Sequence, residues 1–252
     1  MRYAAIALTV CCLCLAVQAQ TADELIQKNI QAKGGMEKIK AIHSVRISGK
    51  VTLGPGIRAT SLQENQRPDL VRETISVQGM TAVKAYDGST GWQIQPFEGH
   101  KDPELMGEDE MKNLLLDADF DGPLVDYKEK GNTVQYMGHD QVDGDDALRL
   151  KVTLKNGDII YYFLDPDSSL EIRKEVQQFI RGSVHESIID LGSYKPVAGV
   201  MYPYSISQGT KANPSQENVS VEKIEVNQPI AAVDFAVPAS LKQGSKGESE
   251  KK

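Results

Sequence analysis

The pattern that most constrains the fold of this chain is an alternation of apolar and polar residues with a period of two. It is clearest in the segment ALRLKVTLKNGDIIYYFLD, residues 147–165. Even-numbered positions from Leu148 to Leu154 hold leucine or valine, and the odd-numbered positions between them hold arginine, lysine or threonine. Because successive side chains of a strand point to opposite faces, this spacing predicts a half-buried strand. Asn156-Gly157 is a favoured hairpin turn, so an antiparallel hairpin is predicted here.

Similar strand patterns, separated by turn residues, continue through most of the chain after residue 43. No strand–helix–strand alternation accompanies them, which argues against a parallel sheet. The predicted class is therefore mainly β (α+β), with roughly ten antiparallel strands that can curl into an open or closed barrel. One domain is predicted over residues 20–240, followed by a disordered polar tail, 241–252. Further strands are predicted at 44–53, 59–66, 70–77, 81–86, 92–95, 172–180, 184–191, 200–207 and 219–226.

A first helix is predicted before the strands. Thr21 and Glu24 match a capping box, and Gly34-Gly35 is a suitable stop. The apolar residues between them recur at helical spacing in a single stripe. One face of this helix is therefore expected to pack on the rest of the domain, and residues 36–42 are expected to add a short helical turn.

A second helix is predicted between the two runs of strands. Met111, Leu114, Leu115 and Ala118 follow the i, i+3, i+4, i+7 spacing of an amphipathic helix, and acidic residues precede it. Periodicity leaves two interpretations open, because the helix either completes the core or forms a lid over an apolar cavity. The strand IIYYFL, residues 159–164, is apolar on both faces, so it is covered on both sides or borders such a cavity.

Residues 1–19 are predicted to be a secretory signal peptide. Arg2 precedes an apolar run that is too short to span a membrane, and Ala19 fits a small-residue cleavage site. The three cysteines of the chain lie between residues 11 and 14, so the mature protein would contain no disulfide. The alternative is a lipoprotein signal in which Cys11 is lipidated, giving a lipid-anchored protein.

Composition and motifs argue against several function classes. The net charge is −7 without a basic cluster, which disfavours nucleic-acid binding. No two histidines stand at metal-ligand spacing, and no nucleophile, phosphate-loop or zinc-protease motif occurs. The acidic segment 140–146 fits a hairpin with Asp143-Gly144 at its tip better than a calcium loop. No enzyme activity, metal or cofactor is predicted, and a carboxylate pair assembled from distant segments is left open.

A set of short motifs resembles one protein family. Their order is similar to that in LolA-type periplasmic lipoprotein carriers and the wider outer-membrane lipoprotein-sorting family, and the resemblance covers nearly the whole predicted mature chain. The segment YKPVAGVMYP, residues 194–203, is similar to the version in less-studied relatives. The matching motifs are Arg67-Pro68-Asp69-Leu70, Asp87-Gly88, Trp92, Pro96-Phe97 and, near the end, Phe235 with Pro238.

The resemblance implies a strongly curved antiparallel half-barrel, with helices on its concave side and an apolar cavity for acyl chains between them. It also implies that Arg67 hydrogen-bonds backbone carbonyls of the lid and holds it closed, with Arg72 as a competitor. Pro96-Phe97 would end the strand of Trp92 where the helical insert begins. The residues predicted to bind ligand are Trp92, Phe97, Met111, Leu114, Leu115, Leu150, Val152 and Tyr162.

The function expected from this resemblance is that of a monomeric periplasmic carrier with transient membrane contact. It would hold an acyl chain or a lipoprotein, because each buried methylene contributes about 0.8 kcal/mol. The alternative is an envelope protein-interaction or stress-sensing module on the same fold, without lipid transport.

Overall fold

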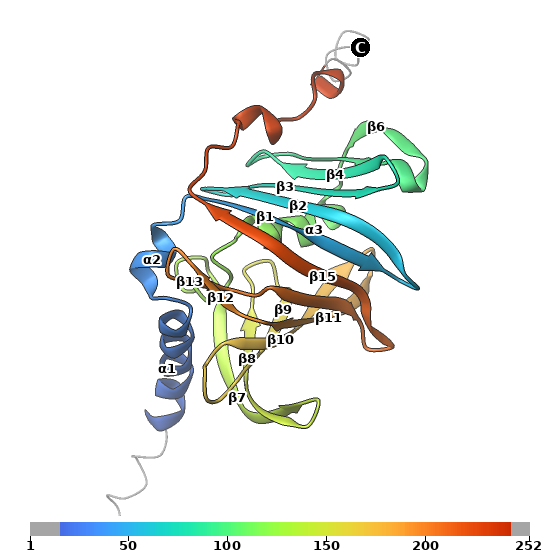
Figure 1. Cartoon of the computed structure of the whole chain (residues 1–252). Coiled ribbons are helices and arrows are strands. Elements are labelled where there is room, and N and C mark those ends of the chain that lie inside the picture. The colour runs from blue at the N-terminus through green and yellow to red at the C-terminus, as the bar shows by residue number, and fades with distance from the viewer. Residues whose placement is uncertain (1–15, 243–252) are drawn as a thin grey trace, which may run out of the picture.

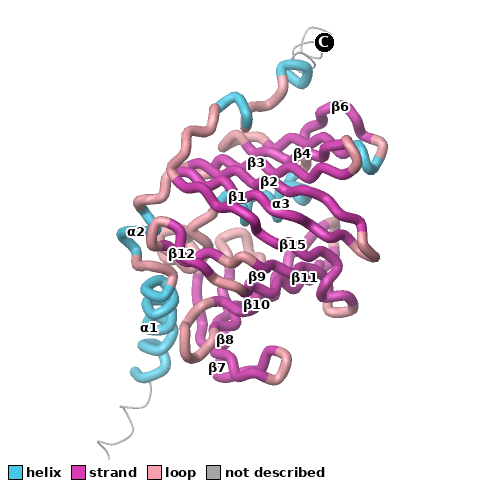
Figure 2. The backbone as a smooth tube through the Cα atoms, viewed as in Figure 1, coloured by secondary structure: helices cyan, strands magenta, loops and turns pink. Residues whose placement is uncertain are grey.

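The computed structural model describes residues 16–242, with side chains described from residue 22 onward. Figures 1 and 2 show helices α1 (Ala16–Ala32), α2 (Met36–Lys40) and α3 (Glu108–Ala118) beside a large sheet. Short 3-10 turns lie at η1 (Pro96–Glu98) and η2 (Ala232–Asp234). The strands are β1 (Ser44–Leu53), β2 (Ile57–Gln66), β3 (Leu70–Val77), β4 (Met80–Tyr86), β5 (Gly91–Gln95), β6 (His100–Leu105), β7 (Thr133–Val142), β8 (Asp145–Thr153), β9 (Ile159–Leu164), β10 (Glu171–Ile180), β11 (Ser183–Gly192), β12 (Lys195–Val197), β13 (Val200–Tyr202), β14 (Ser205–Thr210) and β15 (Asn213–Val226).

Thirteen of these strands form one antiparallel sheet in the order β6-β5-β4-β3-β2-β1-β15-β14-β11-β10-β9-β8-β7. β1 and β15, from opposite ends of the domain, pair at its centre and join the two runs of strands. β6 and β7 are left as the two edges, so the curved sheet stays open as a half-barrel (Figure 1). The predicted mainly β class with a single curved antiparallel sheet is therefore confirmed.

Several element boundaries differ from the sequence predictions for identifiable reasons. The predicted strand 200–207 is two strands, β13 and β14, because Pro203 lies between them and cannot donate a ladder hydrogen bond. α1 begins at Ala16, so Thr21 lies inside the helix and the predicted capping box was wrong. The signal-peptide residues 1–15, with Cys11, and most of the predicted polar tail, 243–252, lie outside the described residues.

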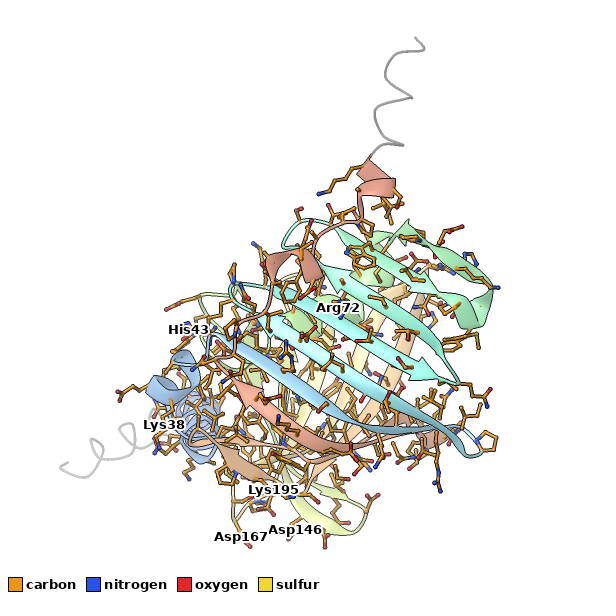
Figure 3. The ribbon with its side chains drawn as sticks, turned by 45° about the horizontal axis from the view of Figure 1, so that its top comes forward. Lys38, His43, Arg72, Asp146, Asp167 and Lys195 are labelled. Atoms are coloured by element: carbon orange, nitrogen blue, oxygen red, sulfur yellow. The ribbon has the colours of Figure 1, made fainter. Side chains whose placement is uncertain are left out.

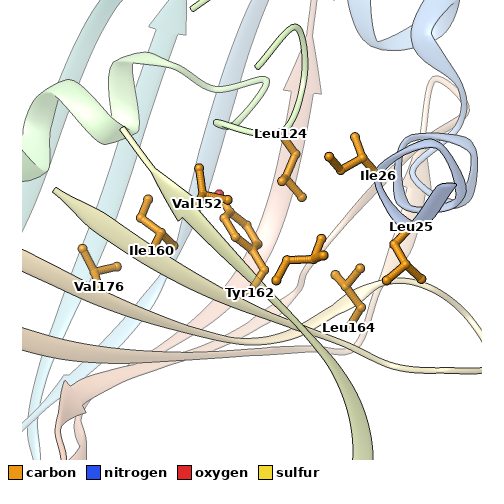
Figure 4. Close-up of a cluster of buried hydrophobic side chains, with 9 residues drawn as sticks. Leu25, Ile26, Leu124, Val152, Ile160, Tyr162, Leu164 and Val176 are labelled. Carbon is orange, nitrogen blue, oxygen red and sulfur yellow. The ribbon is translucent and has the colours of Figure 1, made fainter. Parts of the chain in front are cut away.

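The main core cluster lies on the concave side, between α1 and the strands β8 to β10 (Figure 4). Leu25 and Ile26 of α1 meet Tyr162 and Leu164 of β9, and Leu124 of the segment after α3 closes the cluster. The two-sided apolar strand β9 is thus covered by α1 on this face. On its other face Phe163 packs with Val142 and Ala147 in a smaller cluster.

The C-terminal segment covers part of the opposite, convex face of the sheet. Val237 and Leu241 pack on Val83 and Trp92, and the indole nitrogen Nε1 of Trp92 donates a hydrogen bond to the Phe235 carbonyl at 2.9 Å. Val71 and Tyr86 pair directly, and their side chains face α3. Side chains alternate between the two faces of a sheet, and Trp92 belongs to the other set of positions, so it faces away from α3. The sheet therefore has two separately covered faces.

Candidate functional site

One face of α3 is held against strands β3 and β4. Leu114 and Ala118 are each 2% exposed and pack on Val71 and Met106. Gly91 opens β5 beside them, and a Cβ at this position would lie 2.6 Å from the Met111 sulfur. The missing side chain of Gly91 therefore makes room for Met111 beneath the helix.

Polar contacts hold the other side of α3 against the opposite part of the sheet. Lys112 Nζ donates to Asp158 Oδ1 at 3.0 Å and to the Phe179 carbonyl at 2.8 Å. The Asp109 carboxylate accepts from the Arg181 backbone N–H at 3.0 Å, in the turn between β10 and β11. The helix therefore bridges two walls of the half-barrel, with apolar packing on one wall and ion pairs on the other.

A groove of about 440 Å³ lies along α3. Leu115 and Leu116 line it, together with Tyr86, Pro123 and Leu154. Leu115 is 40% exposed, and Leu116 beside it makes the apolar surface of the helix continuous along the groove. Charged side chains of both signs also line the groove, namely Lys112, Lys130, Lys155, Asp69 and Asp119.

The carboxylates of this groove differ in their environment. Burial raises the pKa of Asp69 above its usual value, and Asp69 lies close to Gly88 of the Asp87-Gly88 turn. Asp119 accepts two hydrogen bonds from Lys130 Nζ, at 2.6 and 2.7 Å. Lys130 also donates to the Gly122 carbonyl at 2.9 Å, which fixes the chain after α3.

Arg67 anchors the segment that follows α3. Its Nη1 and Nη2 donate to the two carboxylate oxygens of Asp121 at 2.8 and 2.7 Å. Its Nε and Nη2 also donate to the backbone carbonyls of Ile42 and Ile39, at 2.7 and 3.1 Å. The planar guanidinium thus joins the end of α2 to the segment after α3.

Comparison of whole structures identifies the fold. A DUF1329 family protein from Desulfovibrio piger has a TM-score of 0.55 at 11% identity, covering 85% of this chain and 97% of that chain. An outer membrane lipoprotein-sorting protein domain from Vibrio parahaemolyticus has 0.53 at 13%, covering 86% and 97%. A LolA superfamily protein from Nitrosomonas europaea has 0.55 at 10%, also covering 86% and 97%. The fold is LolA-like.

The comparison at the level of sequence found no match, either with a family model or with a curated protein. The structural comparisons nevertheless confirm, as a likeness of fold, the LolA-like resemblance that was inferred from short motifs. Across residues 16–242, none of the helices is both long enough and apolar enough to cross a membrane.

The LolA-like fold does not bring the predicted ligand-binding residues to one place. Leu115 lines the groove, while Met111 and Leu114 pack toward the sheet. Leu150, Val152 and Tyr162 are at most 2% exposed in the core with α1, so they form packed core rather than an open wall. Trp92 faces the convex side, and Phe97 is exposed on η1.

Two other expectations for this region need correction. Pro96-Phe97 does end the strand of Trp92, but β6 follows before the helix, so the insert begins with an edge strand. Arg67 does donate hydrogen bonds to backbone carbonyls, but these carbonyls belong to α2 and to the segment that follows it. Its contact near α3 is the carboxylate of Asp121. Arg72 is no competitor, because it pairs with Glu64 on the face away from α3, toward the viewer in Figure 3.

Sequence reasoning missed a charged cluster on the concave face beneath α3. Glu73 of β3 lies next to Lys84 of β4 in the ladder, on the face of Val71, and hydrogen-bonds the Asp117 carboxyl of α3. Burial, followed by the Asp117 charge, raises the pKa of Glu73 well above its usual value. The only sequence signal was a charged residue at a position where the alternation of β3 points inward.

This pair is a carboxyl pair assembled from distant segments, the arrangement that the sequence left open. Its two members hydrogen-bond each other, so they lack the gap of about 5 Å or more that glycosidase carboxyls keep for a sugar or water. Within residues 16–242 no three or more His, Cys, Asp or Glu side chains gather where they could hold a metal ion.

Proposed function

We propose that this protein is a periplasmic binding protein and carrier for an amphiphile, whose acyl chain it holds beside α3. The observation that carries the proposal is the pair of leucines on α3, Leu115 and Leu116, in an open groove of about 440 Å³. α3 bridges two walls of the half-barrel, so an acyl chain in this groove lies where movement of one helix changes its burial.

The LolA-like fold supports this assignment. The Vibrio parahaemolyticus structure with this fold is an outer membrane lipoprotein-sorting protein domain, and a lipoprotein is such an amphiphile. The groove volume of about 440 Å³ leaves room for several methylenes, and at about 0.8 kcal/mol each these give useful affinity. The secretory signal predicted at residues 1–19 would deliver the protein to the compartment where such ligands occur.

The contacts of α3 provide a route for loading and release. Its apolar side is packed on β3, whereas its other side is held by Lys112 and by the exposed pair between Arg181 and Glu110. Exposed ion pairs contribute little, about 0–1 kcal/mol each. The Lys112–Asp158 pair is more costly to break, because the Asp158 side chain is only 3% exposed, so a ligand that replaces this contact is needed to free the polar side while Leu114 keeps the helix on β3.

Native mass spectrometry of the protein purified from an envelope fraction tests this proposal, followed by extraction and lipid analysis. We expect a bound acyl species that is lost in Leu115→Arg. Leu105→Arg is the matched control, because Leu105 is 55% exposed on β6, outside the groove lining. The same spectra give the mass of the mature chain and so test cleavage after Ala19.

Two outcomes would overturn the carrier function. One is an apo mass that does not change when lipid or lipopeptide is added. The other is equal loss of ligand in Leu115→Arg and Leu105→Arg, which would show that the groove does not hold it. A stable complex with an envelope protein, without lipid, would instead support the interaction-module alternative.

A further inference from the structure

A second pocket lies on the convex face of the sheet, under the C-terminal segment. Its volume of about 450 Å³ falls in the range of about 300–1,000 Å³ that small-molecule sites occupy. One side comes from β3 and β5 and the other from residues 233–242, and Figure 3 shows Arg72 of β3 on the sheet face toward the viewer. This convex pocket is lined by Arg72, Trp92, Val233, Asp234, Val237 and Pro238, among others.

The apolar part of the convex pocket is held in place by packing. Trp92 is 6% exposed, and its Nε1 donates to the Phe235 carbonyl at 2.9 Å. Val237 packs in the same cluster as Trp92. The C-terminal segment is therefore anchored on the sheet on both sides of the pocket, and Trp92 and Val237 give the pocket an apolar surface.

Arg72 brings a positive charge that the sheet neutralises only in part. Its Nη1 donates to Glu64 Oε2 at 3.3 Å, which is longer than the usual range of about 2.7–3.2 Å. The other oxygen of Glu64 accepts from Nε and Nη2 of Arg46, at 2.9 and 2.8 Å. One carboxylate thus serves two arginines, and among the described residues Arg72 has no second acceptor for its remaining donors.

Asp234 brings a negative charge to the same pocket. It lies in η2, where its backbone N–H donates to the Ala231 carbonyl at 2.9 Å, so the turn fixes its position. Within residues 22–242 its carboxylate accepts no hydrogen bond and forms no ion pair. Arg72 and Asp234 therefore line one pocket with opposite charges that are not paired with each other.

The remaining cation of the convex pocket is Lys242, whose charge interacts with the Asp87 carboxylate in the turn before β5. An anionic ligand alone would meet the unpaired carboxylate of Asp234, and a cationic ligand alone would meet Arg72. A ligand that carries both charges and an apolar group complements Arg72, Asp234 and Trp92 together.

We propose that the convex pocket binds a small zwitterion with an apolar side chain, which is the chemistry of a free apolar amino acid or a short apolar peptide. The ligand carboxylate accepts from the guanidinium of Arg72, whose planar fork matches a carboxylate. The ligand ammonium lies against Asp234, and the apolar side chain packs on Trp92. The pocket and the groove beside α3 have no lining residue in common, so this inference does not depend on the carrier function.

The single tryptophan of the chain reports binding, because Trp92 lines the pocket. Trp92 emission of the full chain is titrated with leucine, with isocaproate, which lacks the ammonium, and with isopentylamine, which lacks the carboxylate. We expect leucine to bind at least about tenfold more tightly than either analogue, because each analogue leaves one charge of the pocket unpaired. Titration with leucyl-leucine separates the two sources, since tighter binding than leucine assigns a peptide and weaker binding a free amino acid.

Two variants assign each end of the ligand to its partner. Arg72→Gln should reduce the advantage of leucine over isopentylamine to about twofold or less, and Asp234→Asn should do the same for its advantage over isocaproate. The matched controls are Lys50→Gln and Glu222→Gln, which remove the charges of an exposed pair between β1 and β15. These controls should leave both preferences unchanged.

Three outcomes would overturn the inference. They are equal binding of leucine and its two analogues, unchanged preferences in both Arg72→Gln and Asp234→Asn, and failure of both leucine and leucyl-leucine to bind at millimolar concentration. Thermal melts show whether each variant is folded. If Arg72→Gln unfolds because Glu64 loses a partner, Asp234→Asn decides the question, since that side chain has no contact to lose. Binding of acyl ligands beside α3 is measured separately and is left intact by all of these results.

Discussion

Arg67 and Asp121 form a bidentate pair, with nitrogen–oxygen distances of 2.8 and 2.7 Å, that ties the end of β2 to the segment after α3. The Asp121 side chain is only 4% exposed, so its charge depends on this partner and on Lys40. The carbonyls of Ile39 and Ile42 complete the set of acceptors for the guanidinium. This one arginine therefore positions both α2 and the chain that leaves α3.

Removing the carboxylate of this pair should destabilise the fold. We expect Asp121→Ala to lower the free energy of unfolding by about 3 kcal/mol, because Arg67 is left without its main partner. The control is Glu222→Ala, which breaks the exposed pair with Lys50 and should cost less than about 1 kcal/mol. Urea unfolding of both variants measures the difference, and equal effects would contradict the anchoring role of Asp121.

The same pair predicts a pH dependence. Burial opposes ionisation of Asp121, but the hydrogen bonds from Arg67 and Lys40 outweigh it and hold its pKa below the usual value. A lowered pKa in the folded state gives stability that is complete above the unfolded-state pKa of about 3.9 and is lost as the pH falls through the folded-state value. The stability difference between wild type and Asp121→Asn should therefore shrink below about pH 4. A difference that stays constant down to pH 2 would exclude this linkage.

The fluorescence emission of Trp92, the single tryptophan of the chain, should report whether the C-terminal segment is packed on the sheet. Phe235 is 1% exposed, and its carbonyl accepts the Trp92 indole hydrogen. Phe235→Ala should loosen the segment and shift Trp92 emission to longer wavelength, because water then reaches the indole. Val233→Ala, at a side chain 75% exposed, should leave the spectrum unchanged. Unchanged emission in Phe235→Ala would show that the segment is held by other contacts.

Leucines at two predicted ligand positions should behave differently. Leu150 is fully buried among core residues, so Leu150→Ala should lower the free energy of unfolding by about 3 kcal/mol. Leu115 is 40% exposed, and Leu115→Ala should cost less than about 1 kcal/mol. Chemical unfolding without ligand measures both. A large cost at Leu115 would indicate that it belongs to the core rather than to the groove.

The bulge between the two central strands should tolerate only glycine. A Cβ at Gly49 of β1 would lie 2.5 Å from the backbone oxygen of Ser220 in β15. Gly49→Ala must move backbone, and we expect a loss of about 1–3 kcal/mol. Gly192→Ala is the matched control, because a Cβ there meets no atom within 4 Å. Similar melting temperatures for the two variants would mean that β15 shifts at little cost.

Alternation and turn chemistry were enough to predict most strands. The predicted ranges 44–53 and 70–77 match β1 and β3, because these strands have a repeated period and clear turns at their ends. β6 has no such pattern, since as an edge strand it is mostly exposed and needs no apolar face. The helix α3 begins three residues before Met111. The apolar periodicity did not reveal this start, because the first turn of the helix is acidic.

The sequence by itself determined the class of the fold, because the period of its apolar residues and its turns act locally along the chain. It also determined that α3 would have one apolar face. Only the tertiary structure decided what that face covers, that Trp92 belongs to the opposite side of the sheet, and that Glu73 meets Asp117. These contacts join residues far apart in the chain, and the physical reason is the curvature of a sheet whose first and last strands pair at its centre.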